Sequence, residues 1–247
     1  MSMCLVIRTD MRKTVIFVLA AAALIACREN HIELYSEAPR IEFGEDVYLM
    51  FDDRDYLDAW ISGTTAAMDT SFRAQLIGNL LESPIGYCVR TEPAAESSFD
   101  LSVTFSQPYS FPVGETVVSS PISVSCPGKE YASTRNMPVY GIVDILYDET
   151  APEHGFGQGR VENLVCRLSV TLQVYPQSWD SATWGAYSTA KYFLMMETFR
   201  AVHDDISKTV DNQLKIRAAY NAFKKENGPL YGDDEDSGTE IAFPIKQ

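Results

Sequence analysis

LVCRLSVTLQVY, residues 164–175, alternates strictly between apolar side chains and mostly polar ones. Successive side chains of a β-strand point to opposite faces of its sheet, so this period of two predicts a long strand with one buried face and one wet face. Pro176 lacks the N–H that a strand ladder needs and is expected to end the strand. The expected inward residues are Leu164, Cys166, Leu168, Val170, Leu172 and Val174, and the expected outward residues are Val165, Arg167, Ser169, Thr171, Gln173 and Tyr175.

The chain before this strand reads as a series of further strands separated by Pro, Gly and Asp turns. The expected strands are Ile41–Phe43, Val47–Phe51, Phe72–Leu81, Gly86–Arg90, Phe99–Phe105, Val117–Ser125 and Val139–Tyr147. The last of these is apolar on nearly both faces, which indicates a central position in its sheet. Short strands at such intervals are typical of an antiparallel β-sandwich, immunoglobulin-like in the broad sense, and we assign it to residues 39–175. The charged run at 52–55 is expected to be a loop leading into a helical turn near Trp60, and 155–160 a flexible hairpin loop.

The chain after Pro176 has a helical pattern instead. Ser188 is a predicted helix cap before apolar residues at three-to-four spacing, and a second helix is expected over residues 212–225, stopped by Gly228-Pro229. An acidic turn at 233–238 precedes Ile241–Phe243, which we expect to add a last strand. The sequence therefore predicts a mainly β fold followed by a small C-terminal helical segment, residues 176–247, packed on the sheet.

The N-terminus carries a predicted export signal. Arg12 and Lys13 precede an apolar run over residues 14–26, which has the length of a signal-peptide core. We expect residues 1–26 to be a signal peptide, with Met11 as an alternative translation start. The run ends Leu24-Ile25-Ala26-Cys27, which resembles a bacterial lipoprotein box. The resemblance implies cleavage before Cys27, lipidation of Cys27 with acyl chains such as palmitate, and a lipidated tether over residues 27–38; the alternative is an ordinary secretory signal with a chance cysteine.

The composition excludes several classes of partner and site. The formal charge is −14, and residues 1–26 carry more basic than acidic groups, so the remainder is still more negative. Such a chain repels nucleic acid. Cys88, Cys126 and Cys166 are too far apart in sequence for a zinc or iron–sulfur motif, and the sequence does not choose a disulfide among them. We find no catalytic, cofactor-binding or metal-binding constellation, and we expect a protein that is not an enzyme.

One motif remains at the junction of the two regions. It consists of Pro176-x-x-Trp179 followed by Trp184-Gly185-Ala186-Tyr187-Ser188-x-x-Lys191. Together with the lipobox, the β-rich body and the two helices, it resembles a family of Bacteroidota cell-envelope lipoproteins classed as a domain of unknown function. That resemblance implies lipid anchoring at the outer membrane and an accessory role in capturing glycans or other nutrients beside outer-membrane uptake proteins. It implies no catalytic residue.

Two interpretations of Trp179, Trp184 and Lys191 follow. In the first they form a structural joint, in which the tryptophans fill the space between sheet and helix while Lys191 finds an acidic or carbonyl partner. In the second the tryptophans form a stacking platform for sugar rings. For the whole protein we expect a non-enzymatic binding module. The alternatives are a structural or adhesive, pilin-like surface lipoprotein and, third, a carboxylate-based glycan hydrolase.

Overall fold

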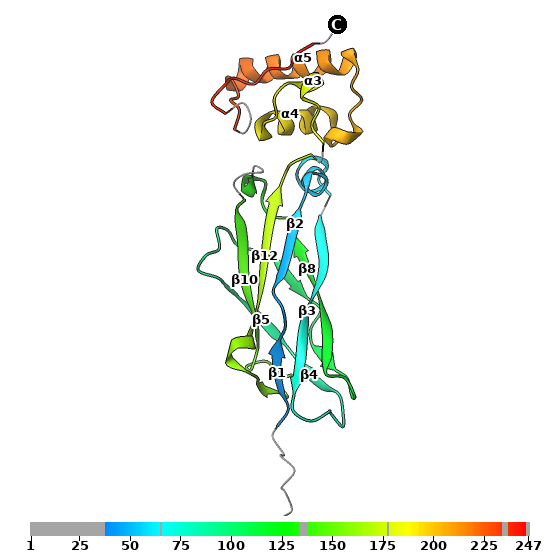
Figure 1. Ribbon diagram of the computed structural model, residues 1–247, viewed down its shortest axis with the longest axis vertical. Helices are drawn as coiled ribbons and strands as arrows, with labels where there is room; N and C mark the ends of the chain where they lie inside the picture. Colours follow the sequence, from blue (N-terminus) through cyan, green and yellow to red (C-terminus); the bar gives the residue numbers. More distant parts are fainter. Residues whose placement is uncertain (1–37, 65, 134–137, 177, 234–236, 246–247) are drawn as a thin grey trace, which may run out of the picture. The chain divides into compact units, whose positions relative to one another are not determined.

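The computed structural model describes residues 38–245 apart from 65, 134–137, 177 and 234–236. The predicted signal peptide, Cys27 and the tether up to residue 37 lie outside the described residues. In the described part of the chain no helix is long and apolar enough to span a membrane. Residues 38–247 form one unit of the chain, in which strands precede the main helices (Figure 1).

Two sheets build the sandwich, and each takes strands from distant parts of the sequence. The first sheet has the order β11-β1-β3-β8-β6, and the second has the order β2-β12-β10-β5 with β9 also paired to β12. The first sheet consists of β1 (Arg40–Phe43), β3 (Ala67–Ile77), β6 (Val103–Phe105), β8 (Val117–Ser125) and β11 (Gly157–Gln158). The second consists of β2 (Val47–Phe51), β5 (Val89–Pro93), β9 (Ala132–Ser133), β10 (Tyr140–Tyr147) and β12 (Val165–Gln173). A smaller sheet pairs β4 (Ile85–Tyr87) with β7 (Tyr109–Phe111).

The predicted mainly β fold with C-terminal helices is confirmed. Most strand pairs are antiparallel, but β2 and β9 run parallel to β12, and β11 runs parallel to β1. The chain crosses from one sheet to the other between β1 and β2, at the turn over residues 44–46. As expected, β10 is an inner strand, between β12 and β5.

Strand β12, which corresponds to the long strand predicted at residues 164–175, has the predicted buried face. Cys166, Leu168, Val170 and Leu172 are all 0% exposed, and Val174 directly after the strand is too. The other face is drier than predicted, because Ser169 and Thr171 are only 7% exposed. These two small side chains lie on an inner strand between β2 and β10, and the Thr171 hydroxyl donates to the backbone oxygen of Val139 at 2.8 Å.

Several predicted element bounds were wrong. Residues 99–102 are not strand, because β6 pairs with β8 only over residues 103–105, and Phe99 instead stacks on Tyr131. The strand expected at 72–81 begins earlier and ends at Ile77, before Gly78 with φ +117°. Residues 241–243 form no strand; Ile241 and Phe243 are buried in the core.

The two predicted loops also have regular structure. Residues 155–160 contain β11, and Arg160 donates to the buried carboxylate of Glu42 with Nε at 3.0 Å from Oε2. The charged run at 52–55 begins a helix rather than a loop, because Asp52 accepts from the N–H groups of Arg54 and Asp55 while Asp55 accepts from the N–H of Asp52. This capping box starts α2 (Asp53–Tyr56), which continues into the π-helix η1 (Leu57–Ser62).

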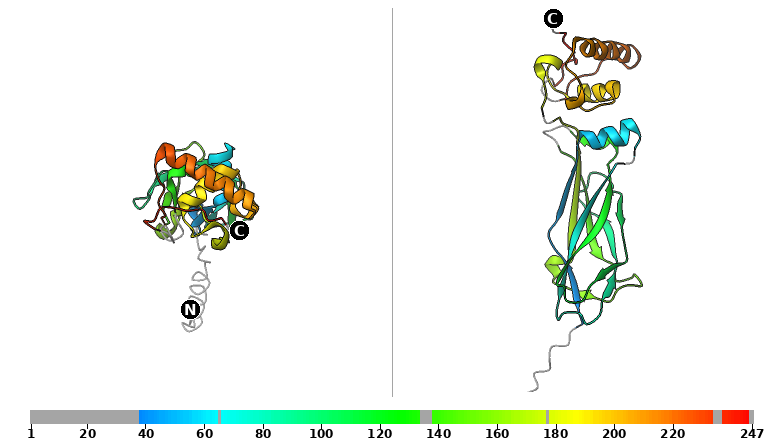
Figure 2. Two further views of the ribbon diagram at one scale, coloured as in Figure 1. Left: turned by 90° about the horizontal axis from the view of Figure 1, so that it is seen from above. Right: turned by 90° about the vertical axis from the view of Figure 1, so that its right-hand side faces the viewer.

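The helices lie at the end of the sandwich remote from Ala38 (Figures 1 and 2). The C-terminal helices are α3 (Ser181–Trp184), α4 (Thr189–Phe199) and α5 (Val210–Asn227), with the 3₁₀ turn η4 (His203–Asp205) between α4 and α5. Two further 3₁₀ turns, η2 (Lys129–Tyr131) and η3 (Val161–Asn163), lie between strands. Ser188 caps α4 as predicted, by accepting from the N–H of Lys191, and α5 ends at Gly228. Contacts with α2 and η1 hold α4 to the sandwich: Tyr56 stacks on Phe193 with ring centroids 4.7 Å apart, and Arg200 donates to the backbone oxygen of Ile61.

Candidate functional site

The structure brings Trp179 and Lys191 to two consecutive carbonyl groups. Trp179 Nε1 donates to the backbone oxygen of Gly185 at 2.7 Å, and Lys191 Nζ donates to the backbone oxygen of Ala186. Lys191 is 1% exposed and also lies 5.8 Å from the centre of the Phe243 ring. The expected carbonyl partner of Lys191 is therefore present, and the turn at 185–186 is fixed from both sides.

Trp184 has no exposed face. Its side chain is 0% exposed in the core, so it offers no surface on which a sugar ring could stack. Trp179 is half-buried and makes edge contacts with Tyr187 and Tyr192, at centroid distances of 5.2 Å and 6.0 Å. The geometry of the motif is that of a joint between the last strand and α4.

A hydrogen-bond network crosses this joint into the sandwich. The Tyr192 hydroxyl on α4 donates to Oδ2 of Asp53 on α2 at 2.5 Å, and it accepts from the N–H of His203 at 2.9 Å. Burial raises the pKa of Asp53, although the hydrogen bond from Tyr192 works in the opposite direction. Asp53 is thus a half-buried carboxylate whose position is set by a side chain of the helical segment.

A second carboxylate is fixed on the helical side. Oδ1 of Asp204 lies 2.9 Å from Nδ1 of His203 and accepts from the Ser178 hydroxyl at 3.2 Å. The hydrogen bond to His203 lowers the pKa of Asp204, so this carboxyl is ionised at neutral pH. His203 itself is buried, under the half-buried ring of Trp179 at a centroid distance of 5.1 Å.

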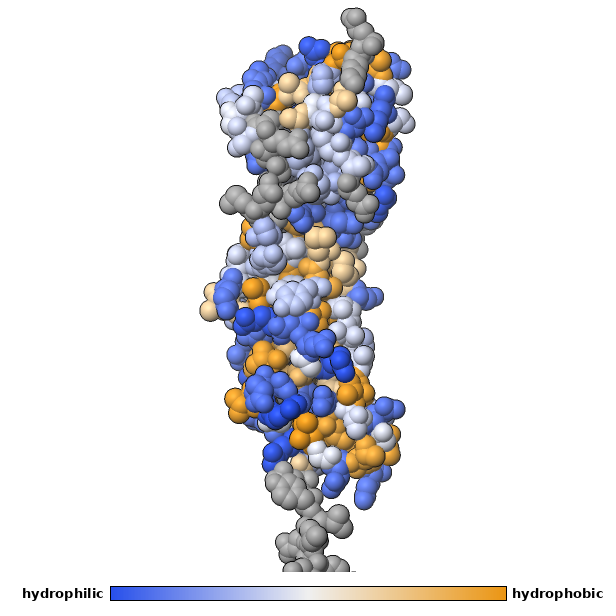
Figure 3. All heavy atoms as spheres, in the orientation of Figure 1, coloured by the Kyte–Doolittle hydropathy of each residue, from blue (hydrophilic) through white to orange (hydrophobic). Residues whose placement is uncertain are grey.

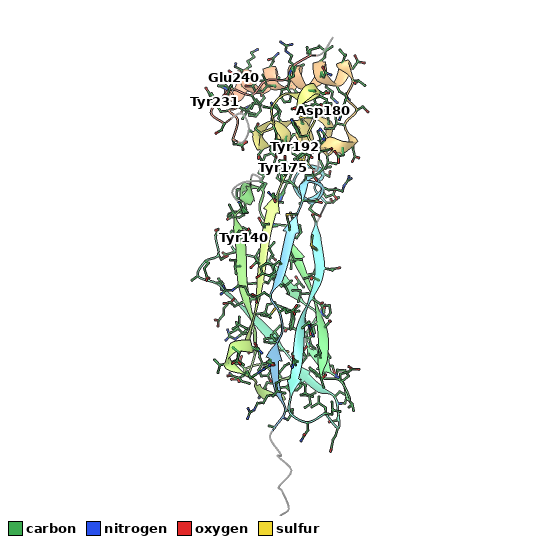
Figure 4. The ribbon with its side chains drawn as sticks, viewed as in Figure 1. Tyr140, Tyr175, Asp180, Tyr192, Tyr231 and Glu240 are labelled. Carbon is green, nitrogen blue, oxygen red and sulfur yellow. The ribbon has the colours of Figure 1, made fainter. Side chains whose placement is uncertain are left out.

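Asp53 and Asp204 border a hollow where β2 and β12 end and the helical segment begins. The hollow has a volume of about 510 Å³, and we call it the junction hollow. It is lined by Met50, Asp52, Asp53, Arg54, Gln173, Tyr175, Val202 and Asp204. Figure 4 shows Tyr175 and Tyr192 close to the place where the last strand meets the helices. A volume of this size, with a few fixed polar groups and an aromatic wall, suits a small organic ligand.

The charge of the junction hollow is mainly negative. Three carboxylates line it, and its one lining cation among the described residues, Arg54, is held by Asp205 at 3.3 Å. Ionised carboxylates accept hydrogen bonds and repel anions. The hollow is therefore equipped to take hydroxyl or amine donors, with the Tyr175 ring, Met50 and Val202 as apolar surface.

The described residues provide no cluster of three or more His, Cys, Asp or Glu side chains that could hold a metal ion. Cys88, Cys126 and Cys166 are all free thiols, and Cys166 is packed as a buried apolar residue, as predicted. Burial raises the pKa of Cys126 and of Cys166 to about 12, so neither is a thiolate at neutral pH.

Sequence reasoning did not find the junction hollow. The sequence pattern predicts a loop at Asp52 and Asp53, and for Tyr175 only an outward position on the strand. The D-x-x-D spacing of Asp52 and Asp55 is a helix-capping signal, and it could have placed this acidic run at the start of a helix. The approach of Asp204 has no such signal, because it depends on how the helical segment folds back onto β12.

Comparisons with known proteins give fold likeness only. No protein-family profile matches the chain, and no curated protein sequence matches it. Among solved structures, the apo form of the Calx CBD1 domain is similar with a TM-score of 0.34 and 13% identity, over 56% of this chain and 98% of that one. A two-domain protein of unknown function from Bacteroides fragilis has a TM-score of 0.35 and 9% identity, over 75% of this chain and 57% of that one.

A protein of unknown function from Bacteroides ovatus is similar as well, with a TM-score of 0.32 and 12% identity, over 53% of this chain and 44% of that one. Likenesses this distant concern the arrangement of strands and assign no activity. Because no family profile matches, the lipoprotein family suggested by residues 176–191 stays a prediction.

Proposed function

We propose that this protein is a lipid-anchored, non-enzymatic binding protein of the bacterial outer membrane that captures glycans in the junction hollow. The observation that carries the proposal is the hollow itself. Fixed carboxylates, Gln173 and the aromatic wall of Tyr175 line it, and Figure 4 shows Tyr175 where the last strand meets the helices.

The chemistry of the hollow supports an uncharged glycan. Sugar hydroxyls are donors that carboxylates accept well, and the C–H face of a sugar ring packs against tyrosine. Uronic acids and phosphorylated glycans would meet Asp52, Asp53 and Asp204, while Arg54 is already paired with Asp205. The proposed class of ligand is therefore a neutral glycan, bound without a metal ion.

A glycan array followed by calorimetry tests this function. The matched variants are Asp204→Asn, which removes one charge from the hollow, and Asp211→Asn, which removes another exposed charge, on α5 outside it. We expect binding of neutral glycans by the parent protein, a loss of about 10-fold or more in D204N, and no change in D211N. Binding that is equal in both variants would contradict the hollow as the site. Release of reducing sugars by the purified protein would contradict the proposal that the protein is not an enzyme.

The anchor is tested separately. Metabolic labelling with a fatty acid should mark the parent protein and leave Cys27→Ser unlabelled. Proteinase treatment of whole cells then shows whether the body of the protein faces the outside. Unlabelled parent protein in the soluble fraction would contradict lipid anchoring while leaving the glycan site open to its own test.

A further inference from the structure

Exposed large side chains on the outer face of the second sheet lie beside the junction hollow. Tyr48 is 72% exposed, Met50 54% and Tyr140 43%. We call these three residues the β2 strip. Large side chains at such exposure are not needed for the core, and three on one face of a sheet require another explanation.

Strand register places the strip in two rows. Met50 pairs with Thr171, and Thr171 pairs with Tyr140, so these side chains form one row across β2, β12 and β10. Tyr48 pairs with Ser169 in a neighbouring row on the same face. Tyr140 lies on the sandwich, below the level of Tyr175 in the view of Figure 4.

Met50 connects the strip to the hollow, because it belongs to both. Gln173 and Tyr175 continue the outer face of β12 into the hollow. Tyr48 is level with Ser169, and Tyr175 is six residues further along an extended chain, which at ~3.3 Å per residue is roughly 20 Å. A single sugar is much shorter than this path, so only a chain of several units could touch both ends.

The surroundings of the strip favour a sugar chain over a protein surface. Ser169 and Thr171, which separate the large side chains, are small and only 7% exposed, so the large side chains stand apart from one another, and an ion pair between Arg167 and Asp144 at 3.0 Å forms the next row. Figure 3 shows polar and apolar residues interleaved over the sandwich in this orientation, rather than one continuous apolar area. A stable protein interface has an apolar, fully buried centre, whereas a glycan offers alternating apolar faces and hydroxyl edges.

We infer that the β2 strip is a second part of the glycan site, so that the protein binds an extended neutral oligosaccharide of several units, with one end in the junction hollow and the chain lying over Met50 toward Tyr48. This inference rests on the proposed function, since it extends the same site. Tyr48 would act at the far end of the chain, where short sugars do not reach.

The test measures affinity against chain length. Full-length protein in detergent is titrated with malto-, cello- and xylo-oligosaccharides of one to eight units, and Tyr48→Ala is compared with Tyr231→Ala, a tyrosine 57% exposed in the helical segment. We expect affinity to rise with length in the parent protein and in Y231A. In Y48A the longest chains should lose about 10-fold in affinity while the shortest bind as before. Circular dichroism melts verify that both variants fold.

The outcomes separate the two proposals. If affinity does not depend on chain length, or depends on it equally in Y48A and the parent, the β2 strip is not part of the site. The hollow remains the proposed site in that case, provided that D204N still weakens binding. If no series binds, this inference falls together with the proposed function. Sedimentation analysis tests whether a second copy of the protein occupies this face instead. If the parent protein is a dimer and Y48A is a monomer, the inference is overturned in favour of self-association.

Discussion

The hydroxyl of Tyr192 lies 2.5 Å from Oδ2 of Asp53, a residue 139 positions earlier in the chain. The Tyr192 hydroxyl oxygen also accepts from the N–H of His203, so α2, α4 and η4 meet at this one hydroxyl group. This contact couples the helical segment to the sandwich and at the same time positions one carboxylate of the junction hollow. Stability of the joint and the proposed binding in the hollow therefore depend on shared residues.

Replacing Tyr192 by Phe tests the contribution of that hydroxyl. The variant keeps the ring but leaves the Asp53 carboxylate and the His203 N–H without this partner. We expect the free energy of unfolding, from urea denaturation, to fall by about 1–3 kcal/mol. Tyr231→Phe is the control, since Tyr231 is 57% exposed and should not change stability. An unchanged midpoint in Y192F would show that the contact contributes nothing.

The two tryptophans of the motif should differ in their effect. Trp184 is 0% exposed, so Trp184→Ala opens a large cavity and should cost about 3–5 kcal/mol of unfolding free energy. Trp179 is half-buried, and Trp179→Ala loses part of that packing plus the bond to Gly185, so its cost should be smaller. Thermal melts of both variants give the order. If W184A has the same melting temperature as the parent protein, Trp184 is not part of a structural joint.

Gly185 is expected to be required for its conformation and its surroundings. Its φ is +80°, and an added Cβ would lie 3.3 Å from the backbone oxygen of Ala242 and from Cδ of Pro244. Gly63 has a φ of +74° and a ψ of 25°, in the left-handed region that alanine adopts at a cost of about 1–2 kcal/mol, and nothing lies within 4 Å of an added Cβ, whereas Gly185 combines its positive φ with a ψ of −171°, which is a stricter glycine conformation. Gly185→Ala should therefore lower the denaturation midpoint more than G63A does. Equal denaturation midpoints of the two variants would show that neither the conformation nor the surroundings of Gly185 make it more demanding than Gly63.

Asp180 should make stability depend on acid pH. It caps α3, and its hydrogen bond from the Thr183 hydroxyl, together with Lys208, lowers its pKa to about 2. In the unfolded chain an aspartate has a pKa of ~3.9, so on acidification the unfolded state binds a proton before the folded state does. The stabilisation by Asp180 is therefore present above pH ~4 and is lost as the pH falls toward ~2. We expect the stability difference between the parent and Asp180→Asn to shrink over that window. A difference independent of pH would contradict this assignment.

Local patterns in the sequence predicted much of the fold. The period of two in residues 164–175 gave the buried face of β12, and β2 and β8 were predicted with the bounds that the structure has. Ser188 was recognisable as a cap because a cap depends only on its own first turn. Such features are encoded by neighbours in sequence, so they can be read without the tertiary structure.

Contacts between distant residues were not predictable in this way. The parallel pairing of β2 with β12 joins residues more than a hundred positions apart. Ser169 is buried because its strand lies between β2 and β10. Asp53 and Asp204 come together for the same reason. Their sequence neighbourhoods are ordinary acidic runs, which on their own are typical of a solvated surface.

The parallel pairing of β2 with β12 has a mechanical consequence. A pull on the first residue of β2 and the last residue of β12 acts in opposite directions along the two strands, because the strands are parallel. The register pairs from Val47–Leu168 to Phe51–Leu172 then carry the load together, in shear, rather than opening one after another like a zipper. A pull along these two strands is therefore resisted by several paired residues at once.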